Sequence, residues 1–219
     1  MENNNATAVP PWEAGLVIIV TFFVSAFLGA AILLTIGYGA AGVIGEIAIL
    51  IVPLIYLLSK RINIKSYVGI NLQPKYILLG LASGALLFLL NIAVSAALSF
   101  LPSQTVEQTN QDILSNSSTT PGFIMIAASL ILAGICEEFA FRGFLQNTLN
   151  RRYSFVPAVL VSALVFGIFH FDPQGTYIIS AFILGLTLGY IYHRTNYVTS
   201  ATAHATMNLI VLAFVLLGI

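Results

Sequence analysis

The sequence predicts an all-α membrane protein: a polytopic bundle of about seven to eight transmembrane helices that forms one integral membrane domain over residues 1–219. Hydrophobic residues make up 58% of the chain and charged residues only 7%, whereas an average soluble domain carries roughly a quarter charged residues. Apolar runs long enough to cross a bilayer recur along almost the whole length. The formal net charge is zero, so membrane lipids are the expected surroundings and nothing favours nucleic acid.

Seven apolar runs are expected to span the membrane, and the breaks between them set their approximate limits. They cover about residues 14–38, 43–58, 76–101, 122–145, 155–171, 177–192 and 198–219. The third span is expected to end at Pro102, and the polar stretch 103–121 is expected to form one long solvated loop. Two pairs of glycines four residues apart, Gly80 with Gly84 and Gly185 with Gly189, predict close packing between helices.

The short loops differ in charge, which predicts how the chain crosses the membrane. Basic residues fall in the second, fourth and sixth loops: Lys60, Arg61, Lys65, Lys75, Arg151, Arg152 and Arg194. The alternate loops carry Glu107, Asp112 and Asp172, which we expect to be solvated, and no Lys or Arg. The excess of basic residues predicts that the N-terminus and the basic loops are cytoplasmic and that the C-terminus is outside. The short multi-pass chain fits a prokaryotic cell membrane.

The fourth span contains the densest group of polar residues, at membrane depth. Charged side chains there are costly, so they tend to be paired or functional. Glu138 and Arg142 are four residues apart on a helix, with the acid nearer the N-terminus, which favours an ion pair. Glu137 then points about 100° away around the helix. A helix end at the membrane interface is the alternative. The neighbouring Cys136 is interpreted as a buried, packed residue rather than a nucleophile.

Two further helices carry polar pairs at helical spacing. Phe166 and His170 share one face of the fifth span. His204 and Asn208 share one face of the seventh, where both need partners from other helices. The Ser and Thr residues around them are weak signals, because they can bond back to their own helix. Glu46, in the second span, is expected to be paired structurally. An acid pair, two histidines and an amide on three helices are the parts of a hydrolytic site.

These residues resemble a known family, the CAAX prenyl proteases and bacteriocin-processing proteases, also called CPBP or Abi. The family pattern has three blocks: EExxxR, FxxxH and HxxxN or HxxxD. Here they read Glu137 to Arg142, Phe166 to His170 and His204 to Asn208, in the same order. The resemblance covers about residues 122–219, which we expect to be the catalytic half of the domain.

The resemblance implies an intramembrane endopeptidase that hydrolyses a membrane-associated, prenylated or leader peptide. Glu137 would activate water, His170 would help to position it, and His204 and Asn208 would donate to the oxyanion. Glu138 and Arg142 would form a supporting ion pair, with Phe166 packed against the site. A glutamate and a metal mechanism both remain open. No metal ligand is assigned, although Glu138, His170 and His204 would be the candidates for Zn²⁺.

Two other functions remain open, and one geometric difficulty stands against the site. The chain could be a non-enzymatic immunity or partner protein that keeps the fold, or a transporter or proton relay that uses the buried acids. In a bundle of straight helices His170 lies near the outer end of its span, whereas His204 lies in the inner part of another. Their convergence requires a tilted helix, a re-entrant segment or a different topology.

Overall fold

The computed structural model describes residues 9–101 and 104–218, and within these ranges it is built from helices joined by short connections, with no strand. The predicted all-α class is confirmed. The elements in chain order are α1 (Pro11–Thr35), α2 (Tyr38–Ser59), α3 (Ile64–Val68), α4 (Pro74–Ala97), α5 (Gln104–Asn116), α6 (Thr120–Glu138), the π-helix η1 (Phe139–Gln146), α7 (Asn147–Arg152), α8 (Phe155–Phe169), α9 (Thr176–Arg194) and α10 (Tyr197–Leu217).

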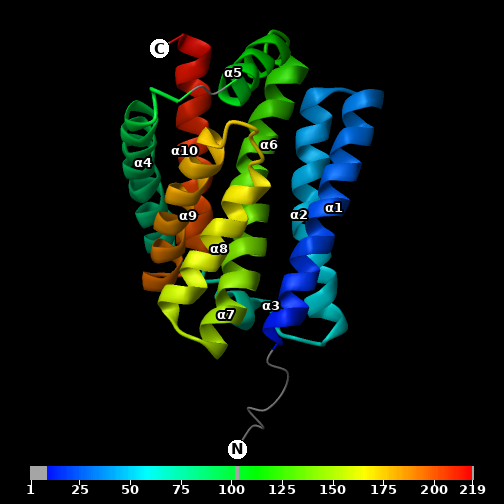
Figure 1. Cartoon of the computed structure of the whole chain (residues 1–219), viewed down its shortest axis with the longest axis vertical. Coiled ribbons are helices and arrows are strands. Elements are labelled where there is room, and N and C mark those ends of the chain that lie inside the picture. The colour runs from blue at the N-terminus through cyan, green and yellow to red at the C-terminus, as the bar shows by residue number, and fades with distance from the viewer. Residues whose placement is uncertain (1–8, 102–103, 219) are drawn as a thin grey trace, which may run out of the picture.

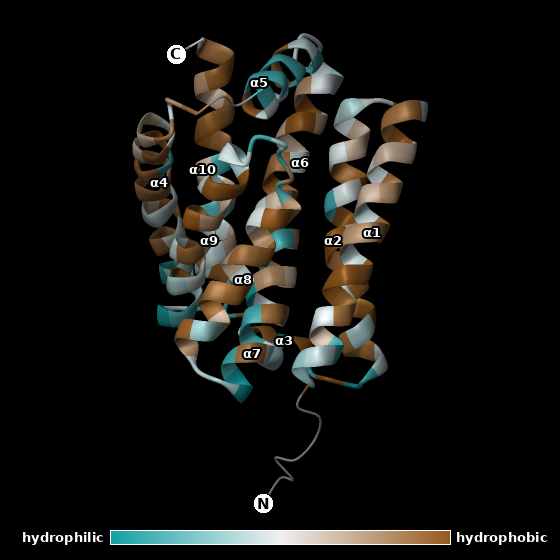
Figure 2. Ribbon diagram, in the orientation of Figure 1, coloured by the Kyte–Doolittle hydropathy of each residue, from teal (hydrophilic) through white to brown (hydrophobic). Residues whose placement is uncertain are grey.

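The long helices run side by side in one bundle, with the first described residues and the C-terminal end of α10 at opposite ends (Figure 1). α1 and α2 form a pair on one side, and α4, α8, α9 and α10 lie on the other side of α6. Apolar residues cover the outside of the bundle along its length, while polar residues gather at the ends and inside (Figure 2). Six helical segments within the described ranges are long and apolar enough to cross a membrane. The protein is therefore an integral membrane protein.

The fifth predicted span, α8, is shorter than the others. It has 15 residues and ends at Phe169, whereas a helix needs about 20 residues to cross the hydrocarbon core. In Figure 1 α8 stops below the upper ends of α6 and α10, and a loop continues from it to α9. Within the described residues, six long helical segments therefore cross the bundle, and a seventh, α8, ends inside it.

The fourth predicted span continues without a break through η1 and α7, so that residues 120–152 form one helical rod. The π-helical stretch Phe139–Gln146 follows directly after the acid pair, and all eight of its residues are buried. Short π-helical segments inside α-helices are frequent at functional sites. Gly143 lets α3 approach this stretch, because a Cβ there would lie 2.5 Å from Val68 Cγ1.

The predicted close packing at small residues is confirmed. A Cβ on Gly80 would lie 2.5 Å from Thr202 Cβ, and one on Gly84 would lie 2.5 Å from Thr206 Cβ, so both glycines let α4 contact α10 directly. On α9, a Cβ at Gly185 would meet Ala163 of α8, and one at Gly189 would meet the side chain of Gln146.

The predicted loop at 103–121 is wrong, because most of it forms the helix α5. The helix lies across the end of the bundle where the C-terminus lies (Figure 1). Ile113 is buried, whereas most of the other side chains of α5 face away from the bundle, which explains why its composition resembles that of a loop. The described residues leave out Pro102 and Ser103, where the third span was expected to end and the loop to begin. They also leave out Ile219, where the last span was expected to end.

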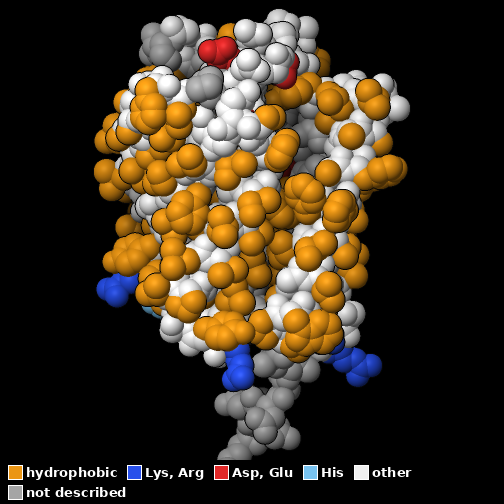
Figure 3. Space-filling view, viewed as in Figure 1, with side chains coloured by type: hydrophobic (Ala, Val, Ile, Leu, Met, Phe, Trp, Pro, Cys, Tyr) orange, Lys and Arg blue, Asp and Glu red, His pale blue; other side chains and the backbone are white. Residues whose placement is uncertain are grey.

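Charged side chains separate between the two ends of the bundle. On the visible face, Lys and Arg lie at the end where α1 begins, and Asp and Glu lie at the opposite end (Figure 3). The three basic loops therefore share one end, as the sequence predicts. Which end is cytoplasmic stays a prediction.

Candidate active site

The acid–arginine pair lies in the centre of the bundle, and the predicted ion pair is confirmed. Arg142 Nη1 lies 3.1 Å from Glu138 Oε1, and both side chains are fully buried. The second guanidinium nitrogen donates to the carbonyl oxygen of Gly185 on α9 at 3.1 Å. The guanidinium also lies 4.3 Å from the centre of the Phe166 ring, a favourable cation–π position. Three helices therefore hold Arg142 in one place.

Glu138 has partners for both carboxylate oxygens. Oε1 faces Arg142 and also lies 3.3 Å from Nδ1 of His204. Oε2 accepts a short hydrogen bond from the hydroxyl of Ser200, one turn before His204 on α10. Buried charges are retained where such contacts replace water. Glu138 therefore fixes the position of α10 relative to α6.

Glu137 contacts the same histidine from the other side. Its Oε2 lies 3.8 Å from Nε2 of His204. The Glu137 side chain is almost buried, and Oε2 has no hydrogen-bond partner among the described residues. His204 thus lies between two carboxylates, and Glu137 keeps an oxygen that can accept a proton.

His170 follows directly after the end of α8. Its Nδ1 lies 2.8 Å from the carbonyl oxygen of Phe166, so Nδ1–H donates and Nε2 is the ring nitrogen that remains for a ligand. The ring of Phe166 lies 4.6 Å from the ring of His170 and 5.9 Å from that of His204. Because α8 ends inside the bundle, His170 reaches the level of His204, and the expected mismatch in depth does not arise.

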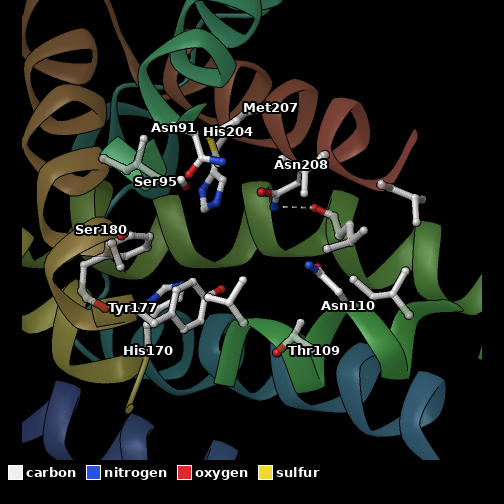
Figure 4. A pocket seen from close by; sticks show the side chains of 18 of the residues that line it. Asn91, Ser95, Thr109, Asn110, His170, Tyr177, Ser180, His204, Met207 and Asn208 are labelled. Carbon is white, nitrogen blue, oxygen red and sulfur yellow. Dashed lines mark hydrogen bonds between the residues drawn. The ribbon is translucent and has the colours of Figure 1, made fainter. Parts of the chain in front are cut away.

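A cavity of about 190 Å³ joins the two histidines and Asn208. α4, α5, α9 and α10 surround it, and the polar side chains that line it come from all four helices (Figure 4). Asn208 donates from Nδ2 to the carbonyl oxygen of Leu130 on α6 at 3.2 Å. The predicted need for a partner on another helix is therefore confirmed, and the second Nδ2 hydrogen remains for a ligand.

A second cavity, of about 470 Å³, lies between the α1–α2 pair and α6 with α8. Glu137, His170 and Tyr177 line it, and the last two also line the first cavity. Glu46 of α2 faces this second cavity as well. The expectation that Glu46 is structurally paired is wrong: no ion pair holds it among the described residues, and its Oε2 is buried without a hydrogen bond.

Asp172 was expected to be solvated, but it is 2% exposed. Its Oδ2 accepts from the backbone N–H of Tyr177 at 2.9 Å, and its Oδ1 accepts from Thr105 of α5 at 2.7 Å and from the N–H of Gln174 at 3.2 Å. Burial raises the pKa of Asp172, but these hydrogen bonds outweigh burial and hold the pKa below its usual value. Asp172 thus caps α9 and ties α5 to the bundle.

Ser200 and Gln146 belong to this centre, but little in the sequence indicates that they do. Ser200 belongs to a run of hydroxyl residues that can satisfy themselves on their own helix, yet its hydroxyl bonds to Glu138 on another helix. Gln146 Nε2 donates to the carbonyl oxygen of Gly189 at 2.9 Å. The signal that was available is the spacing along the sequence, because Gln146 lies four residues after Arg142 and Gly189 lies four residues after Gly185. Cys136 is buried and free, as predicted.

A role for Zn²⁺ stays a prediction. Oε2 of Glu138 accepts from Ser200, and Oε1 faces Arg142 and Nδ1 of His204. No group of three or more His, Cys, Asp or Glu residues could hold a metal ion in the part of the chain that the structure describes.

A family model matches the part of the chain that carries these residues. Residues 119–210 match the family model described as "Type II CAAX prenyl endopeptidase Rce1-like". The predicted resemblance to the CAAX-protease family is confirmed over this segment. A relative named "Putative membrane peptidase YdiL", from Bacillus subtilis (strain 168), is 34% identical over 86 residues. This alignment covers 39% of the chain and 34% of the relative, so the chain spans about a third of that protein's length. No solved structure matches the chain.

Proposed function

We propose that this protein is an intramembrane endopeptidase that hydrolyses a membrane-associated peptide, prenylated or carrying a leader segment. One observation supports this proposal above the others. Glu137 lies 3.8 Å from His204, and His170 lines both cavities beside this pair. In this proposal these residues supply a base for water and donors for an oxyanion, as peptide hydrolysis requires.

Glu137 is the general base in this proposal. The Glu137 side chain lines a cavity of sufficient volume to hold water, and its Oε2 has no hydrogen-bond partner among the described residues. His170 accepts from the same water through Nε2, because Phe166 holds Nδ1. The water oxygen attacks the scissile carbonyl carbon as its proton passes to Glu137.

His204 and Asn208 stabilise the oxyanion that forms. They are one turn apart on α10 and line the first cavity together (Figure 4). Each has a hydrogen that can point at the same oxygen: a ring N–H of His204 and the second Nδ2 hydrogen of Asn208. Losing one such donor costs about 10²–10³-fold in kcat in other hydrolases.

The supporting pair keeps these groups in position. Glu138 and Arg142 hold α6, α9 and α10 together and orient His204 through its Nδ1. No step of the proposed mechanism passes through zinc, because Glu138 faces Arg142, His204 and Ser200. We expect the purified protein to keep its activity in the presence of a chelator.

Cleavage of two fluorogenic peptides in detergent tests the proposal. One carries a prenylated CaaX-type end, and the other carries a hydrophobic leader segment without a prenyl group. We expect cleavage of at least one, and its loss in Glu137→Ala and in His170→Ala while both variants remain monodisperse. Glu107→Gln is the matched control, because it removes an exposed acid of α5 that lines neither cavity. Full activity in both site variants would overturn the proposal.

A further inference from the structure

Glu46 differs from the other partly or fully buried acids in having no ion-pair or hydrogen-bond partner among the described residues. Glu13 contacts Lys60 and Tyr56, and Glu138 and Asp172 are each held by several donors. Glu46 forms no ion pair within the described ranges, and its Oε2 is buried without a hydrogen bond. An ionised carboxylate at this depth with no cation beside it is costly, whereas a neutral carboxylic acid can act as a proton donor.

The packing of α2 on α6 places Glu46 beside Glu137. Both helices start at the end of the bundle where α5 lies and run in the same direction (Figure 1). A Cβ on Gly39 would lie 2.9 Å from Met125, and one on Gly42 would lie 3.0 Å from Ser129. This register brings Glu46 level with Ala133, one turn before Glu137, about 6 Å away along the helix axis. All three line the same cavity.

Figure 3 shows the outer face of the groove in which this cavity lies, between the α1–α2 pair and the rest of the bundle. If a peptide bond is held between the two cavities, Glu137 and His170 lie on the side from which the water attacks it. Its leaving nitrogen can then face α2. Glu46 is the ionisable side chain that α2 contributes to this cavity.

We propose that Glu46 is a second catalytic carboxyl group, which protonates the leaving amine. The inference rests on the peptidase function proposed above. Water adds to the carbonyl carbon, and its proton moves to Glu137. The carbon–nitrogen bond then breaks, and the nitrogen takes a proton from the Glu46 carboxylic acid. The proton held on Glu137 returns to Glu46 through water in the shared cavity. Two carboxyl groups in different surroundings divide acid and base roles in this way in other hydrolases.

A comparison of leaving groups tests this assignment. The full-length protein in detergent is given a peptide amide that it cleaves and an aryl ester with the same acyl part. An amine needs a proton in order to leave, whereas a phenolate does not. We expect Glu46→Gln to lower kcat on the amide by about 10²–10⁴-fold while changing ester hydrolysis little. Glu137→Gln should lower both rates, and Glu46→Asp should recover part of the amide rate.

Several outcomes separate the inference from its alternatives. Glu107→Gln is again the control that removes an acid outside both cavities and should leave both rates unchanged. The melting temperature of Glu46→Gln should match that of the wild type, because no ion pair is lost. Amide cleavage by Glu46→Gln at the wild-type rate would overturn the inference, as would an equal loss on amide and ester. If the wild type cleaves neither compound, the proposed peptidase function fails as well.

Discussion

Ser200 on α10 donates a hydrogen bond to the carboxylate of Glu138, 62 residues earlier on α6. The Ser200 hydroxyl also lies 3.2 Å from the carbonyl oxygen of Leu188 on α9. This small side chain therefore stands where three helices meet, next to the ion pair of Glu138 with Arg142. Because His204 is one turn further along α10, the hydrogen bond of Ser200 to Glu138 also fixes the position of His204 along the bundle axis relative to the acid pair.

Ser200→Ala should therefore weaken both stability and activity. A buried carboxylate that loses a donor costs about 1–3 kcal/mol, and a shift of α10 moves His204 away from Glu137. Thermal unfolding in detergent and the cleavage rate measure the two effects. Ser129→Ala is the control, because Ser129 bonds to the carbonyl oxygen of Ile126 in its own helix. If both variants have the same melting temperature and the same cleavage rate, the bond between α6 and α10 contributes nothing to stability or activity.

Arg142→Met should be among the most destabilising single changes in the bundle. It leaves the fully buried carboxylate of Glu138 without its cation, and breaking such a pair from one side costs about 3–5 kcal/mol. Adding Glu138→Gln to this variant should recover part of the stability, because the unpaired charge is removed. Melting temperatures of the single and double variants decide this. A double variant no more stable than the single one would contradict the argument.

The sequence predicts the features of this molecule that depend on spacing along one helix. Apolar runs identify the spans, and residues four apart identify the pairs Glu138–Arg142 and Phe166–His170, both found in the structure. The meeting of the three motif blocks followed from the family resemblance. Their chemical roles remain predictions.

Contacts between helices were harder to predict. Asp172 is buried because a threonine of α5 and the N-terminus of α9 surround it. Glu46 has no partner in the part of the chain that the structure describes, because α2 places it at a cavity rather than against a base. The depth of His170 depends on where α8 ends, which apolar composition alone does not fix. In the first two cases the deciding surroundings lie on other helices.

Gly84→Ala should disturb the helix that carries the proposed oxyanion donors. A Cβ at this position would lie 2.5 Å from Thr206 Cβ and 2.7 Å from the carbonyl oxygen of Ala203, so α4 and α10 would have to separate. Overpacking of this kind costs about 1–3 kcal/mol, and a lower cleavage rate should accompany the lower melting temperature. Gly29→Ala in α1 is the matched control, since a Cβ there meets nothing within 4 Å. A loss in the control as large as in Gly84→Ala would show that helix spacing is not the cause.

Asp172→Asn should loosen α5 and the start of α9 in a way that depends on pH. The amide cannot accept at both positions, so we expect a loss of about 1 kcal/mol at neutral pH, as for other helix caps. The pKa of Asp172 lies below its usual value in the folded protein. Its contribution is therefore complete above the unfolded pKa of about 3.9 and is lost as the pH falls through the folded pKa.

Thermal unfolding of wild type and Asp172→Asn in detergent, from neutral pH down to about pH 3, measures this dependence. The difference in melting temperature between the two proteins should stay constant at neutral and mildly acidic pH and shrink toward the acid end. Asp112→Asn on α5 is the control, because that side chain accepts a hydrogen bond from Gln108 of its own helix. A difference that persists unchanged at the lowest pH would mean that the shape of the Asp172 side chain, rather than its charge, holds α5 against the bundle.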